Sequence, residues 1–67
     1  MITDNGKEDA RSFMLGMNSA LSDVVSYENG IISANLLLNN VELMKIADSE
    51  NKYAKGYLKS MELMGWE

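Results

Sequence analysis

Apolar residues in the first third of the chain recur at the spacing of an α-helix. They lie mostly three or four positions apart and are Ala10, Phe13, Met14, Met17, Ala20, Leu21, Val24 and Val25. The residues between them are mostly polar, so a helix here has one apolar face and one polar face. We therefore predict an amphipathic helix over about residues 7–26, with Asn5 as its N-cap and Gly30 as the left-handed residue that ends it.

Two structures are consistent with the next segment, residues 31–48. As a helix after a Ser33 cap, it has an apolar face so wide that we expect the helix to be nearly all buried. That face consists of Ala34, Leu36, Leu37, Leu38, Val41, Leu43, Met44 and Ile46. The alternative is a β-hairpin over residues 24–37, because Asn29-Gly30 favours a type I′ turn between β-prone residues. We favour the helix, since an isolated two-stranded hairpin is weakly stable and residues 36–47 include good helix formers.

The last third of the chain also has helical spacing. Its apolar stripe consists of Tyr53, Ala54, Tyr57, Leu58, Met61 and Met64. We predict that this helix begins at an Asp48 or Ser49 cap and ends at Gly65, with Trp66 folded back over Met61 as in a Schellman motif. A break near residue 49 is expected, although a single long helix with a bend there has the same spacing.

Small residues recur within the predicted helices. Ser12, Gly16 and Ala20 lie four positions apart in the first helix, and Gly56 lies inside the last one. A glycine in a helix interior costs about 1 kcal/mol relative to alanine. We therefore expect these residues to mark a close approach between helices, either within one chain or across a dimer.

Size limits how the chain can be stabilised. A single domain of 67 residues, with residues 1–6 as a flexible N-terminus, buries only about 60% of its unfolded surface. The absence of Cys and His removes disulfides and most metal sites as sources of stability. We predict an all-α fold of three short helices or a bent helical hairpin, completed by self-association into a homo-oligomer. The alternative is an α+β fold with a central β-hairpin around Asn29-Gly30.

The residues that most enzymes use are missing from the chain. There is no His to act as a general base near neutral pH and no Cys to act as a nucleophile. No Ser lies in a Gly-x-Ser-x-Gly motif, and the glycines match no phosphate-binding loop. We therefore expect a protein that is not an enzyme, with no catalytic residues, no cofactor and no metal.

The net charge of −4 opposes nucleic-acid binding by the molecule as a whole. One segment has the opposite character, because Lys52, Lys55 and Lys59 alternate there with two tyrosines, as in a platform for stacked bases. On a helix, however, the lysines lie on one side while Tyr53 and Tyr57 fall near the apolar stripe. We favour a solvated lysine face and keep nucleotide or nucleic-acid contact as an alternative.

The expected apolar surface is larger than three short helices can bury, which favours a protein–protein interaction module. Aromatic and methionine side chains are the expected anchors for a partner. They are Tyr53, Tyr57, Met61, Met64 and Trp66. Small, acidic chains without Cys resemble the accessory proteins of phages and mobile elements. This resemblance, which rests on composition, implies that the protein inhibits or retargets a host protein.

Two other functions are consistent with the composition. A structural protein would self-assemble without any other partner. An acidic mimic of nucleic acid would bind through its carboxylates with a steep salt dependence. Those carboxylates are Glu8, Asp9, Asp23, Glu28 and Glu42. The chain has neither a secretory signal nor an apolar stretch of about 18 residues, so we expect a cytoplasmic location without membrane contact.

Overall fold

The computed structural model describes residues 4–66 and contains three α-helices: α1 (Asp4–Glu28), α2 (Ala34–Lys45) and α3 (Lys52–Leu63). No strand occurs within residues 4–66. The prediction of three helices is therefore confirmed, and the alternative with a central β-hairpin is wrong. The expected flexible N-terminus lies partly outside the described residues, and residues 4–6 form the first turn of α1.

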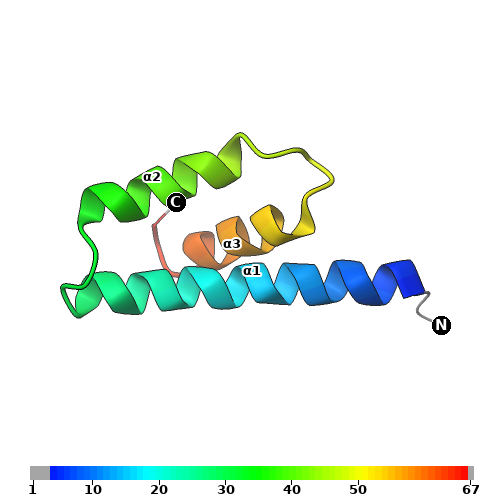
Figure 1. The fold of residues 1–67 in the computed structure, drawn as a ribbon, viewed down its shortest axis with the longest axis horizontal. Helices are drawn as coiled ribbons and strands as arrows, with labels where there is room; N and C mark the ends of the chain where they lie inside the picture. The colour runs from blue at the N-terminus through cyan, green and yellow to red at the C-terminus, as the bar shows by residue number, and fades with distance from the viewer. Residues whose placement is uncertain (1–3, 67) are drawn as a thin grey trace.

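The helices form an elongated bundle in which α1 extends along the whole molecule (Figure 1). The chain measures 42 × 22 × 17 Å along its principal axes. α2 runs back in the direction opposite to α1, and α3 runs in the same general direction as α1. The contact between α1 and α3 is the most extensive one, while α2 packs mainly on α3. α3 is therefore the element that holds the other two helices together.

A Schellman motif joins α1 to α2. Gly30 has φ 75°; its N–H donates to the carbonyl oxygen of Tyr27 at 3.0 Å, and the N–H of Ile31 donates to that of Ser26 at 2.8 Å. A type I′ turn needs a positive φ at both of its central residues, and among the described residues only glycines have one. Asn29 therefore lies in the turn that ends α1, with its N–H donating to the carbonyl oxygen of Val25 at 2.9 Å, and does not start a hairpin; this confirms Gly30 as the stop.

The caps of the two shorter helices decide where each begins. The Ser33 side chain accepts from the backbone N–H of Leu36 at 3.1 Å, which confirms the predicted cap of α2. α3 is capped by Asn51, whose Oδ1 accepts from the N–H of Ala54 at 3.0 Å. The expected cap at Asp48 or Ser49 is wrong, because the Asp48 side chain accepts from the N–H of Glu50 at 2.8 Å and closes the connecting turn instead.

The N-terminal cap predicted for α1 is not in the expected place. The helix already includes Asp4, so Asn5 lies within its first turn and not in front of it. The side chain of Asn5 lies outside the part of the chain that the structure describes.

The C-terminus of α3 repeats the motif that ends α1. Gly65 has φ 85°, and the N–H of Trp66 donates to the carbonyl oxygen of Met61 at 2.8 Å. The indole of Trp66 packs edge-on against the ring of Tyr27, with the two ring centroids 5.2 Å apart. The predicted stop at Gly65 is confirmed, and Trp66 links the last turn of α1 to the end of α3.

The core is small and receives residues from all three helices. Its buried apolar residues are Ala20, Val24, Leu37, Val41, Ala54, Tyr57 and Met61. Only two of them come from α2, so the expectation that this helix would be nearly all buried is wrong. The physical reason is that α2 contacts the bundle along one narrow side, where Leu37 and Val41 face α3 and α1.

Candidate interaction surface

The structure places the five predicted anchors in or beside the core. The side chains of Tyr57 and Met61 are 1% and 0% exposed. Tyr53, Met64 and Trp66 are half-buried, and the Tyr53 hydroxyl donates to Ser19 Oγ in α1. These aromatic and methionine side chains therefore stabilise the monomer, because α3 lies between the other two helices and uses its apolar stripe to hold them.

A polar cluster inside the bundle connects the three helices. The hydroxyl of Tyr57 in α3 donates to Asp23 Oδ2 in α1 at 2.5 Å, and Asn40 Nδ2 in α2 lies 3.5 Å from the same oxygen. Burial of the phenol, together with its hydrogen bond to the Asp23 carboxylate and the charge of that group, raises the pKa of Tyr57. The phenol therefore stays protonated and keeps donating to Asp23.

This cluster also bears on the mimic hypothesis. Of the five carboxylates expected to imitate nucleic acid, Asp23 points into the bundle and Glu42 lies 3.3 Å from Lys45 Nζ. A phosphate-like row needs its charges on the surface without neighbouring cations. Of these five, only Glu8, Asp9 and Glu28 therefore remain as exposed carboxylates without a neighbouring partner in the described part of the bundle, and the support for the mimic hypothesis is reduced.

The lysines of α3 lie apart from its tyrosine rings. Lys55 and Lys59 are exposed and Lys52 is half-buried. The hydroxyls of Tyr53 and Tyr57, in contrast, form hydrogen bonds with Ser19 and Asp23 of α1. Lys59 Nζ lies 3.8 Å from Glu62 Oε1. A platform for stacked bases needs aromatic faces next to the cations. The arrangement thus favours the solvated lysine face over nucleotide contact.

Large apolar side chains remain on the outside of the molecule. The exposed ones are Met14, Leu15, Leu21, Val25, Ile31, Leu36, Leu38, Leu43, Ile46 and Leu63. They outnumber the buried apolar residues of the core, which confirms that the apolar surface exceeds what three short helices can cover. Such residues mark an interaction site only where several of them gather on one side of an element.

Two groups of these residues form regular stripes. On α1, Met14, Leu21 and Val25 lie on the side away from Gly16 and Ala20, which face the bundle. On α2, Leu36 and Leu43 lie on the side away from Leu37 and Val41, and the C-cap residue Ile46 continues this side just past the end of the helix. We call this second group the α2 outer stripe.

Sequence reasoning missed these stripes because it placed the periodic apolar residues of each helix on one face and did not separate the side that packs in the bundle from the side that does not. In α1 the predicted face included both the buried Ala20 and Val24 and the exposed Met14, Leu21 and Val25. Spacing alone does not separate them, because the buried Val24 lies seven residues after Met17 just as the exposed Leu21 lies seven residues after Met14.

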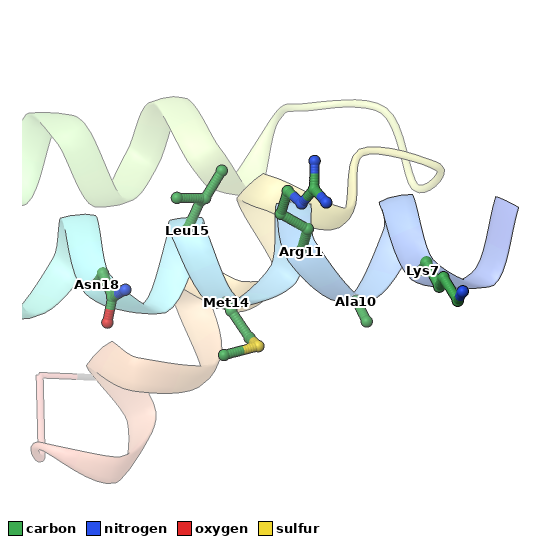
Figure 2. Close-up of a pocket in the computed structure, with 6 residues that line it drawn as sticks. All are labelled: Lys7, Ala10, Arg11, Met14, Leu15 and Asn18. Atoms are coloured by element: carbon green, nitrogen blue, oxygen red, sulfur yellow. The ribbon is translucent and has the colours of Figure 1, made fainter. Parts of the chain in front are cut away.

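A shallow depression of 410 Å³ lies along the N-terminal half of α1. Its lining comes from α1 alone and consists of Lys7, Ala10, Arg11, Met14, Leu15 and Asn18. Figure 2 shows these side chains along α1, and no residue of α2 or α3 is among those that line the depression. The depression is therefore part of an open helix surface and not an enclosed ligand pocket.

Residues 4–66 contain no group of three or more His, Cys, Asp or Glu side chains that could hold a metal ion. Within the same residues no helix has the length and hydropathy to cross a membrane. Comparison of the chain with known protein families, curated proteins and solved structures finds no match.

Proposed function

We propose that this protein is a non-catalytic interaction module that binds another protein through the α2 outer stripe. The observation that supports the proposal is the exposure of Leu36, Leu43 and Ile46. Ile46 is 79% exposed, the highest value among the large apolar side chains that the structure describes. Leu36 and Leu43 are seven residues apart on one side of the helix, and the C-cap residue Ile46 extends the stripe to about 15 Å.

The chemistry around the stripe indicates what kind of partner would fit. The neighbouring charges Glu42 and Lys45 are 3.3 Å apart and neutralise one another. Asn35 and Asn39 add exposed amides and no charge. A surface of this kind suits an apolar groove on a partner protein, since a helix can insert evenly spaced apolar side chains into such a groove. As an adaptor or inhibitor, the chain would act by covering that groove.

Cross-linking in cells of the protein's own host tests the proposal. A photoreactive side chain introduced at Leu43 should form a covalent adduct with one protein, and the same group at Lys55 on the lysine face should not. Leu36→Asp in the Leu43-labelled chain should abolish the adduct, because a buried unpaired carboxylate is costly at an apolar interface.

Leu36 is exposed, so this substitution should leave the helical circular dichroism unchanged. Equal labelling from positions 43 and 55, or an adduct that survives Leu36→Asp, would contradict the proposal. An adduct that contains only the chain itself would contradict it as well.

A further inference from the structure

The outward side of α1 has the residue spacing of a helix–helix seam. Seven exposed residues follow one another at alternating intervals of four and three, and we call them the α1 seam. They are Lys7, Arg11, Met14, Asn18, Leu21, Val25 and Glu28. This is the average period of 3.5 residues at which two helices pack along a common line. With 25 residues, α1 is long enough for about three heptads.

The α1 seam is apolar in its middle and charged at its ends. Met14, Leu21 and Val25 are 61%, 49% and 53% exposed. The N-terminal end has Lys7 and Arg11, and the C-terminal end has Glu28. Among residues 4–66, neither Arg11 nor Glu28 takes part in an ion pair. The charges at both ends are therefore available to a molecule that lies along the seam.

Charge complementarity identifies one occupant and one orientation. A second copy lying parallel would place Arg11 next to Arg11 and Glu28 next to Glu28 of the two chains, which is unfavourable. An antiparallel copy places Arg11 of each chain beside Glu28 of the other. We propose that two copies of this protein associate through the α1 seam in antiparallel orientation.

The register of this dimer follows from the same pairing. When Arg11 lies opposite Glu28, Met14 lies opposite Val25 and Asn18 lies opposite Leu21, and each pair occurs twice. The two Asn18 side chains are then offset by about 4.5 Å along the helices. Their amide groups are close enough to form a hydrogen bond with each other across the two-fold axis. A polar residue at one seam position costs stability but selects the register.

Since only three apolar residues per chain are buried, we expect a dissociation constant on the order of micromolar.

The dimer is independent of the proposed partner site. The α1 seam lies on the side of α1 away from the bundle, and the α2 outer stripe lies on a different helix. Leu21→Asp should abolish dimerisation and keep the cross-link from position 43, whereas Leu36→Asp should do the reverse. The failure of one proposal therefore leaves the other standing.

Sedimentation over a range from low micromolar to millimolar protein tests the association and its orientation. Arg11→Glu and Glu28→Arg should each weaken the dimer about tenfold, because each brings two like charges together at both ends. The chain with both substitutions should dimerise as well as the unmodified protein. In a parallel dimer, or one formed through another face, the double substitution would give no such recovery.

Disulfide trapping gives a second measure of orientation, since the chain has no Cys of its own. A mixture of the Met14→Cys and Val25→Cys chains should form the mixed disulfide under mild oxidation, and neither chain alone should form its own. Disulfides between identical positions would overturn the antiparallel arrangement. A chain that stays monomeric at millimolar concentration would overturn the dimer itself, as would loss of association with Leu43→Asp but not with Leu21→Asp.

Discussion

Gly16 of α1 and Gly56 of α3 each lie against the backbone of the other's helix. A Cβ atom at Gly16 would overlap the carbonyl oxygen of Tyr53, and one at Gly56 would overlap that of Phe13. The hydroxyl of Ser60 donates to the carbonyl oxygen of Met17 at the same crossing, at 3.1 Å. The close approach expected from the small residues is thus confirmed, and it occurs within one chain.

We expect Gly16→Ala and Gly56→Ala each to lower the free energy of unfolding by about 2 kcal/mol, despite the higher helix propensity of alanine. The added methyl group would meet rigid backbone and push α1 away from α3. Urea denaturation followed by circular dichroism measures the effect. Ser22→Ala, on the exposed side of α1, is the matched control and should be neutral or slightly stabilising. Equal stability of all three variants would show that the crossing is looser than described.

Stability should fall in alkaline solution because of Tyr57. Its pKa is raised in the folded protein by burial and by the Asp23 carboxylate. Above a pH of about 10, the unfolded chain therefore loses the phenolic proton while the folded chain keeps it. The contribution of Tyr57 to stability is full below that pH and declines by up to about 1.4 kcal/mol per pH unit above it.

Urea denaturation at several pH values between 9 and 11 measures this decline. Tyr57→Phe is the comparison, because it removes the titrating group and keeps the ring. Its free energy of unfolding should be lower near neutral pH by about 1–2 kcal/mol, since the hydrogen bond to Asp23 is lost. It should also depend less on pH, and parallel curves for the two proteins would contradict the role of Tyr57.

The cap of α3 can be assigned by alanine substitutions. Asn51→Ala should cost about 1 kcal/mol, because the N–H of Ala54 loses its acceptor. Ser49→Ala should be nearly neutral, since Ser49 is exposed and does not cap the helix. Thermal unfolding followed by circular dichroism compares the two variants. A larger loss for Ser49→Ala would place the start of α3 earlier than Asn51.

The turn after α1 requires the left-handed conformation at Gly30. Gly30→Ala should destabilise the protein by about 1 kcal/mol, although a Cβ atom there would meet nothing within 4 Å. Gly30→Asn should cost less, because Asn adopts this conformation more readily than Ala. Chemical denaturation of the two variants gives the order. If the alanine variant is more stable than the asparagine variant, the positive φ at position 30 does not determine the loss of stability, and the prediction is wrong.

The helices and their ends could be predicted wherever the cause was local. The repeat from Phe13 to Val24 predicts a helix, and Gly30 and Gly65 end their helices because a residue without a Cβ atom tolerates a positive φ. The cap of α3 was misplaced because Asp48, Ser49 and Asn51 are all good caps by residue type. Only the geometry of the turn decides which side chain reaches the first free N–H groups.

The predicted anchors show why the site was harder to predict. Tyr53, Tyr57 and Met61 fit an exposed binding face as well as a core, because both use large apolar side chains at helical spacing. Local sequence does not record that α3 lies between the other two helices. Because α1 and α2 pack on α3 with one side each, their opposite sides stay exposed, and the apolar stripes lie there.

The order of residues alone determined that the chain forms helices, roughly where they lie and where two of them stop, because these outcomes depend on interactions between residues a few positions apart. Tertiary structure decided which apolar residues are buried, which helices share the glycine crossing, and that Tyr57 meets Asp23 across 34 positions. Burial depends on what packs against a helix from elsewhere in the chain. An amphipathic helix can also have two apolar sides, and only its neighbours determine which one becomes the core.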